Sequence, residues 1–318
     1  MAKNSGSRKK KRLLKVAGLC VLAAAAVLLP VISYQVDSSH RKSLESQKYI
    51  YRCISEQLNI KEPNVLTAAD FEKLEELQII LNGITTTKPL LKLKNLKLID
   101  FKYGPSPKLN INIDYEPLAK LQKLRDIRIS VMEGIDAVLV RDKLYEKVVP
   151  FLKMLRPRTK PFDLDWLGKL KQIESLSLSY SEMKNYDALA SLPDLRQLGL
   201  GRTTINDPAF LAKLSNLRML NLRGLRNITD FSSLAQLTNL QNLDISATQL
   251  SDIKLLEGLT KLQYLNLNST KIKDIAPLKN LISLQELHLQ DCENISDRQI
   301  EDLQKNLPEL KILRCSRS

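Results

Sequence analysis

A leucine pattern that returns about every 22 residues constrains this 318-residue chain more than any other feature. The pattern reads Leu-x-x-Leu-x-Leu or a close variant, and it starts at Leu195, Leu217, Leu240, Leu262 and Leu284. A repeat of this length is too short to bury its own apolar face, so neighbouring repeats must stack on one another. We therefore predict a solenoid, a fold that presents a long ordered surface and favours binding over catalysis.

The pattern extends in both directions, with isoleucine or phenylalanine in place of some leucines. It also starts at Leu74, Leu96, Leu124 and Ile173, and it starts once more at Leu310, in the form Leu310, Leu313, Cys315. The sequence thus predicts about ten repeats over residues 74–318. The spacing breaks between Leu124 and Ile173, which lie 49 residues apart.

Within one repeat, the Leu-x-Leu alternation predicts a short strand with its leucines turned inward. The other apolar residues recur at spacings of three and favour a 3₁₀ or irregular turn on the back of the coil; an example is the set Ile272, Ile275, Leu278 and Leu281. One turn position carries Thr203, Thr248, Thr270 and Cys292. We expect these side chains to form an internal ladder that bonds to the backbone of the neighbouring coil.

The repeat LTKLQYLNLNSTKIKDIAPLKN (Leu259–Asn280) resembles bacterial leucine-rich repeats of the internalin kind, with Thr where that family often places Asn. The segment Cys53–Leu77 is similar to the helical cap that opens such domains, and Thr67 followed by Asp70 reads as a helix start. The final segment, Leu287–Ser316, is closer to cysteine-containing repeats with a true helix on the back. The resemblance implies an α/β fold: a curved right-handed leucine-rich-repeat solenoid with a parallel sheet on its concave face, and a role in recognising proteins.

The N-terminus predicts a membrane anchor. Residues 1–15 carry seven cations and no acid, and the next 21 residues, Val16–Val36, carry no charge. That apolar run is long enough to cross a bilayer, and the preceding cations place the N-terminus in the cytoplasm. We favour an uncleaved signal anchor, with a cleaved signal peptide as the alternative. Residues 37–73 are then a linker and helical cap, and the repeats are periplasmic or extracellular.

Charge and composition narrow the partners. Half of the formal net charge of +14 belongs to residues 1–15, where it serves membrane orientation. Aromatic residues make up only 5% of the chain and no nucleic-acid-binding motif is visible, so we predict no nucleic-acid partner. The remaining positive charge leaves room for weak binding to anionic envelope polymers.

No enzyme is predicted, and no cofactor or metal. The two histidines, His40 and His288, lie 248 residues apart, and no nucleophile elbow, phosphate loop or metal-ligand cluster is visible. The cysteines are sparse. We predict that Cys292 and Cys315 are buried structural thiols and not members of a disulfide.

The alternation also predicts which side chains the concave face presents. They are the residues between the inward leucines, small near Ser177 and Gly199 and larger from Met219 onward. Tyr and Arg contribute most to interface energies, so we predict a partner-binding patch there, and its residues are Met219, Arg223, Asp244, Tyr264 and His288. The alternative is a face that is merely solvated.

The irregular segment at about residues 131–172 has two interpretations. In the first, the apolar residues of Asp136–Leu155 have helical spacing and predict an inserted amphipathic helix. The basic, proline-containing stretch Arg156–Phe162 that follows is then a loop. An insertion of this kind that leaves the stack is a candidate site for a partner or for self-association. The other interpretation, slightly favoured, is a longer convex helix within two atypical repeats.

Two further functions stay open beside recognition by the concave face. One is a structural cell-envelope scaffold, in which the anchored solenoid spaces other components. The other is a secreted adhesin or effector, which requires signal cleavage. The identity of the protein partner does not follow from the residues.

Overall fold

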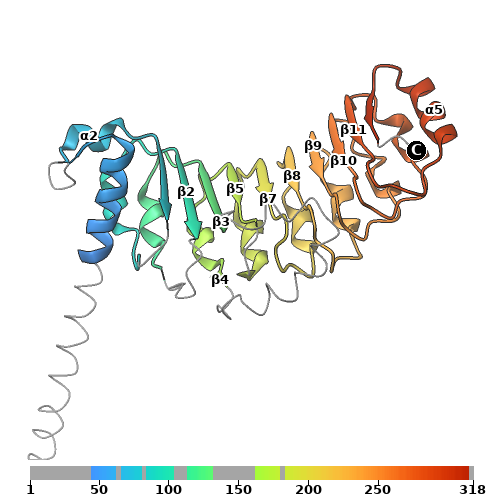
Figure 1. Cartoon of the computed structure of the whole chain (residues 1–318). Helices are drawn as coiled ribbons and strands as arrows, with labels where there is room; N and C mark the ends of the chain where they lie inside the picture. The colour runs from blue at the N-terminus through green and yellow to red at the C-terminus, as the bar shows by residue number, and fades with distance from the viewer. Residues whose placement is uncertain are drawn as a thin grey trace, which may run out of the picture.

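The computed structural model describes residues 44–61, 66–80, 84–103, 113–131, 162–179 and 183–314. They form an elongated, curved stack of coils in which short strands lie side by side along the whole molecule (Figure 1). The parallel sheet that the resemblance to leucine-rich repeats implies is confirmed, because every pairing within this ten-stranded sheet is parallel and joins neighbouring coils. In order, its strands are β1 Glu76–Ile80, β2 Leu98–Tyr103, β3 Asp126–Val131, β5 Ser175–Ser177, β7 Gln197–Gly199, β8 Met219–Asn221, β9 Asn242–Asp244, β10 Tyr264–Asn266, β11 Glu286–His288 and β12 Lys311–Leu313.

The inward leucines stack in register from coil to coil. Leu220 lies opposite Leu243, Leu243 opposite Leu265, and Leu265 opposite Leu287, each at most 2% exposed. Because the strands are so short, most of the stabilisation comes from this continuous apolar column rather than from strand propensity.

The back of each coil from β1 to β11 is a short 3₁₀ turn, as the spacing of three predicts. These turns are η2 Lys88–Lys92, η3 Glu116–Lys120, η4 Asp165–Lys169, η5 Tyr186–Ser191, η6 Ala209–Lys213, η7 Ser232–Gln236, η8 Lys254–Leu256 and η9 Ala276–Asn280. An aspartate before several of them accepts a hydrogen bond from the backbone N–H two residues on, which satisfies a donor that the turn leaves free. The series includes Asp207, Asp230, Asp252 and Asp274, with N···O distances of 2.8–2.9 Å.

A left-handed residue follows each of five strands at the same place, three positions after the strand ends. These residues are Arg202, Gly224, Ala247, Ser269 and Asp291, with φ between 54° and 73°. The left-handed conformation turns the chain sharply from the sheet toward the back of the coil.

The threonine ladder differs from the prediction. The Thr248 and Thr270 hydroxyls donate to the carbonyls of Ile245 and Leu267, three residues earlier in their own coil, at 2.8 and 2.6 Å, and Thr203 does likewise. Between coils, the Cys292 thiol lies 3.1 Å from the Leu267 carbonyl oxygen and 3.6 Å from the Thr270 hydroxyl of the preceding coil. The left-handed turn brings each hydroxyl back over its own coil, so the bond closes locally.

The N-terminal end of the stack is covered by a helix over residues 44–57 and by α2, Ala68–Lys73 (Figure 1). The first helix begins nine residues before the predicted cap segment. Its Gln57 side chain donates to the Glu76 carbonyl at 2.8 Å and accepts from the Gln78 N–H at 3.3 Å, so it occupies the otherwise unpaired edge of β1. The predicted helix start is confirmed, since Thr67 and Asp70 form a reciprocal capping box.

Replacing Thr67 with alanine is expected to lower the free energy of unfolding by about 0.5–2 kcal/mol, because the α2 N-terminus loses its capping hydroxyl. Urea unfolding would measure the loss, and amide exchange over Ala68–Lys73 would locate it. Thr260→Ala is the matched control, because Thr260 is exposed and makes no side-chain hydrogen bond in the described part of the chain. Equal losses in both variants would contradict a capping effect.

At the other end, the predicted true helix is present as α5, Asp297–Asn306, with Ser296 as its N-cap. The register of the last repeat was predicted wrongly. Ile312, not Leu313, pairs with Leu287 on the inward side, and Leu313 pairs with His288. Ile312 and Leu313 are both apolar, so alternation alone does not distinguish the inward one. Cys315 lies outside the described residues.

The strands on either side of the irregular segment are neighbours in the sheet. β3 pairs directly with β5, although 49 residues separate Asp126 from Ser175, so the interpretation as two atypical repeats is wrong. Residues 162–172 supply an ordinary back to this coil, with β4 Phe162–Asp163 pairing with β6 Met183–Lys184 in a small second sheet. The extra residues therefore fall within 132–161. The predicted helix Asp136–Leu155 lies outside the described residues.

The predicted membrane segment, Val16–Val36, also lies outside the described residues. Within the part of the chain that the structure describes, no helix has the length and apolar character needed to cross a bilayer.

Candidate functional site

The concave face has a hollow where the outward side chains are smallest. Ser175 and Ser177 on β5 and Gly199 on β7 form its floor, and its volume is about 420 Å³. The two strands leave little room for a side chain at position 199, since a Cβ placed on Gly199 would lie 3.0 Å from the Ser177 hydroxyl oxygen. A larger residue at position 199 would press against Ser177 and make the hollow shallower.

Larger side chains stand around this floor. Arg128 of β3 lines one side, and Met219 of β8 and Tyr264 of β10 line the other. Met219 is 42% exposed, one of few large apolar side chains so exposed in the described residues. Tyr264 is half-buried, and its ring centre lies 5.1 Å from that of His288 in a tilted arrangement. The hollow therefore combines a neutral floor with one apolar and one aromatic wall.

The structure places three of the five predicted residues on this hollow, namely Met219, Asp244 and Tyr264. Arg223 lies beyond the end of β8, close enough to Tyr264 for its charge to act on the phenol. His288 lies one strand beyond Tyr264 and is not part of the lining.

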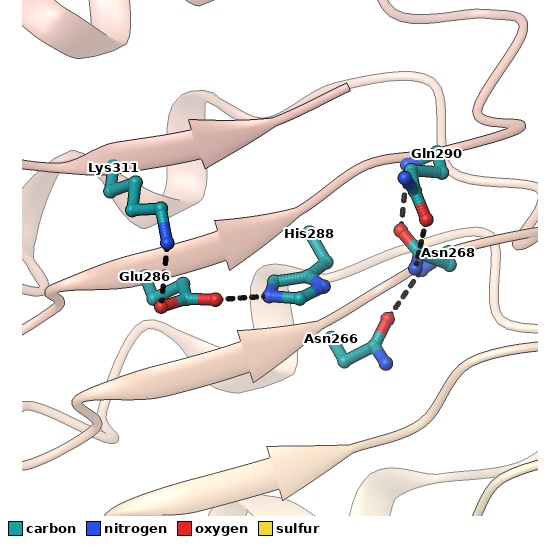
Figure 2. Close-up of polar contacts among 6 residues, drawn as sticks. All are labelled: Asn266, Asn268, Glu286, His288, Gln290 and Lys311. Atoms are coloured by element: carbon teal, nitrogen blue, oxygen red, sulfur yellow. Dashed lines mark hydrogen bonds and ion pairs between the residues drawn. The ribbon is translucent and has the colours of Figure 1, made fainter. Parts of the chain in front are cut away.

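Asp244 and His288 already have partners within the chain. The Asp244 carboxylate accepts from the Ser246 N–H at 2.9 Å and from the Ser246 hydroxyl at 2.6 Å, using the same oxygen, Oδ1. His288 Nε2 lies 2.5 Å from Glu286 Oε1, whose other oxygen is 3.4 Å from Lys311 Nζ. Figure 2 shows this line of polar contacts between β11 and β12.

A second polar line connects the ends of β10 and β11. The Asn268 side chain donates to Gln290 Oε1 at 3.1 Å and accepts from the Gln290 N–H at 2.6 Å, while its own N–H bonds to Asn266 Oδ1 at 3.0 Å (Figure 2). The C-terminal part of the concave face is thus largely bonded to itself. The hollow, by contrast, offers the exposed side chain of Met219 beside its small-residue floor.

The local environment favours hydrogen bonding by Tyr264 as a neutral phenol. Partial burial raises the pKa of Tyr264, and the negative charges of Asp244 and Glu286 raise it further. The hydrogen bond from His288, together with Lys311, lowers the pKa of Glu286, which is therefore ionised at neutral pH. The Tyr264 hydroxyl is consequently a donor at neutral pH, next to fixed negative charge.

Sequence reasoning placed Ser175, Ser177 and Gly199 on the concave face but did not assign them to the site. Their signal was present in the alternating runs Ser-Leu-Ser and Gly-Leu-Gly, in which small residues take successive outward positions. Arg128 was missed, although it takes an outward position in its strand.

In the described ranges no three His, Cys, Asp or Glu side chains come close enough to hold a metal ion. Cys292 is buried, as predicted, and Cys53 is partly buried at the N-terminal cap.

Comparisons with known proteins agree with this architecture. A family model for leucine-rich repeats in two copies matches residues 238–280. No curated protein sequence matches the chain. Among solved structures, internalin C2 from Listeria monocytogenes strain 4b F2365 is 23% identical with a TM-score of 0.54, covering 76% of this chain and 92% of that one. InlP from Listeria monocytogenes is 18% identical with a TM-score of 0.50, covering 76% and 63%.

These likenesses concern the fold. The chain contains leucine-rich repeats and folds as a leucine-rich-repeat solenoid similar to those of internalins.

Proposed function

We propose that this chain is a membrane-anchored recognition protein that binds a protein partner in the hollow of its concave face. The leucine-rich-repeat fold supports a protein partner in general, because a solenoid offers a long concave surface. The anchoring part of the proposal rests on the apolar run Val16–Val36 and the cations before it.

The observation that carries the proposal is a small-residue floor that lies beside exposed Met219 and half-buried Tyr264. Large contacts that lose water on binding contribute most to the affinity of an interface, and Tyr is enriched among them. A protruding partner side chain can enter over Ser177 and Gly199 beside Met219 on the next strand, and Tyr264, two strands further along, can contact another part of the partner. Arg128 and Asp244 lie at the hollow as charges of opposite sign, each with a partner in the chain: Arg128 pairs with Asp126 at 2.8 Å, and Asp244 accepts from Ser246. Their remaining field favours one orientation of a partner.

Site-specific photo-crosslinking tests this proposal in the full-length chain within its own membrane. A photoreactive residue at position 219 would lie at the hollow, and one at Lys279 would lie on η9 at the back of the solenoid. We expect a discrete crosslinked protein from position 219 that is absent from position 279 and is lost when Tyr264 is also replaced by alanine.

Equal crosslinking from both positions would place the contact elsewhere or make it non-specific. No crosslink from either would favour the scaffold function. The intact mass of the chain recovered from membranes checks the anchor: a mass that includes residues 1–36 supports it, whereas a shortened, released chain favours the secreted adhesin or effector.

A further inference from the structure

A second hollow lies outside the concave face, on the edge of the stack where the chain enters each strand. We call it the strand-entry groove; it crosses the starts of β7, β8, β9 and β10 and has a volume of about 300 Å³. Its lining carries three cations, Arg196, Arg218 and Lys261, and one carboxylate, Asp194. The groove is therefore polar and carries net positive charge.

Arg196 and Arg218 stand side by side in this groove. Each immediately precedes its strand, and the Arg218 N–H donates to the Arg196 carbonyl at 2.8 Å. Neighbouring strands lie about 4.8 Å apart, so the two arginine side chains start from adjacent rungs of one ladder. Their like charges repel each other, and an anion bound between them would remove that repulsion.

The residues that immediately precede the strands form a column along this edge, and the cations before β2 and β3 are paired with acidic residues of that column. Lys97 pairs with Glu75 at 2.7 Å, and Arg125 pairs with Glu174 at 3.6 Å, each across neighbouring coils. Arg196 and Arg218 are the next cations along, and both are exposed. Across the residues that the structure describes, neither side chain has an ion pair or a hydrogen bond to the protein. Their donors are available to a ligand.

The base of the groove is held in place by an amide ladder. Asn216 donates to the Pro193 carbonyl at 2.8 Å and Asn239 to the Ser215 carbonyl at 3.0 Å, each bridging two coils. The Lys261 ammonium donates to Asn239 Oδ1 at 2.7 Å, which fixes its position and uses one of its three donors. A preorganised cation of this kind loses less freedom when it binds an anion.

Guanidinium forks match the geometry of phosphate oxygens and bind them through two parallel hydrogen bonds. Arg196 and Arg218 can hold one phosphate between them. Lys261 precedes β10, two strands beyond β8, so it lies about 10 Å further along the stack and can contact a second anionic group. Successive contacts along a groove favour an extended ligand with several phosphates.

We propose that the strand-entry groove binds a linear polymer that carries phosphate groups. The groove follows the direction in which the coils stack, as a linear chain requires. A single orthophosphate would engage the arginine pair and leave Lys261 without a contact. This site is separate from the concave hollow. Failure of polyphosphate binding would therefore leave the proposed protein-binding function untouched, and the reverse also holds.

The test measures binding of fluorescent inorganic polyphosphate to the full-length chain in phosphatidylcholine nanodiscs at physiological ionic strength. The variant Arg196→Gln/Arg218→Gln is expected to raise the Kd at least tenfold. Lys213→Gln/Lys254→Gln is the matched control, because it removes the same charge from exposed positions on η6 and η8, and its Kd is expected to change less than twofold. Arg196→Lys/Arg218→Lys, which keeps the charge but loses the forks, is expected to fall between them.

Thermal unfolding of all three variants would show that the exposed substitutions leave the fold intact. Equal weakening in the arginine and control variants would overturn the proposal in favour of non-specific charge attraction, as would the absence of polyphosphate binding by the unaltered chain. If orthophosphate competed as strongly as polyphosphate at equal phosphate concentration, the ligand would not need to be a polymer, and that part of the proposal would be wrong. Arginine-dependent binding to phosphatidylglycerol vesicles without polyphosphate binding would replace the polymer by a lipid headgroup.

Discussion

Replacing Leu243 with alanine is expected to lower the free energy of unfolding by about 2–5 kcal/mol. Leu243 is fully buried and stacks between Leu220 and Leu265, so its removal leaves a cavity in the middle of the column. The neighbouring coils are held in register by their strands, so they have little freedom to close the gap. Urea denaturation followed by circular dichroism gives the change, with the m-value checking that unfolding stays cooperative.

Met219→Ala is the matched control for that measurement. Methionine and leucine lose a similar volume on truncation to alanine, but Met219 points outward from the same sheet and is 42% exposed. Its truncation is expected to cost about 0.5 kcal/mol or less. If it cost as much as Leu243→Ala, the assignment of inward and outward positions in this sheet would be wrong.

Gly224→Ala is expected to destabilise the chain by about 1–3 kcal/mol. Gly224 has φ of 73°, in the left-handed region, and a Cβ there would lie 2.9 Å from Cγ of Arg202. Ala247 takes the same place one coil later with φ of 54°, so the backbone conformation alone is tolerated. The strain of a positive φ and the displacement of the Arg202 side chain both contribute to the expected loss, and thermal unfolding would measure the total.

Gly258→Ala separates this effect from the general consequence of replacing glycine. Gly258 lies outside the left-handed region, and nothing lies within 4 Å of its added Cβ. Alanine there is expected to be neutral or to stabilise by up to about 1 kcal/mol, because it restricts the unfolded chain. A comparable loss at both glycines would argue against the contact with Arg202.

The repeat architecture was predictable from sequence because one physical rule acts on every coil. Leu217, Leu240 and Leu262 must point inward for neighbouring coils to stack, so their spacing alone indicates the strands and the parallel sheet. The capping box at Thr67 and Asp70 was predictable for a similar reason, since both partners lie within one helical turn. The aspartate series at Asp207, Asp230, Asp252 and Asp274 was equally visible, because its members recur with the repeat, but it was not identified.

Features that depend on geometry between elements were not predictable in the same way. The ten-residue helix α5 changes how the chain enters β12, so a constant Leu-x-x-Leu spacing assigned Leu313 to the place of Ile312. The threonine hydroxyls were expected to reach the next coil, but the left-handed residue before each of them determines where they point. Repeat spacing does not reveal that conformation, since Arg202, Ala247 and Ser269 do not signal it as glycine would.

For the two proposed binding sites, too, the parts set by a single repeat were predictable and the parts formed by several repeats were not. Met219, Asp244 and Tyr264 were predictable as concave-face residues because strand alternation fixes their side of the sheet. The hollow itself arises from small residues on β5 and β7 combined with large ones on β8 and β10, and no single repeat contains it. The strand-entry groove likewise requires Arg196, Arg218 and Lys261 from three separate coils, and it becomes apparent only once their side chains are placed on one edge.

The direct pairing of β3 with β5 has a consequence for how this molecule can change. The chain leaves the sheet at Val131 and re-enters the coil at Phe162, and the coils on either side remain in register across that interval. The 49 residues from Asp126 to Ser175 and the 22 from Asn242 to Tyr264 each join directly paired strands, so the register of the sheet does not depend on how many residues lie between two strands. A change in the length of residues 132–161 is therefore expected to leave Asp126 paired with Ser175.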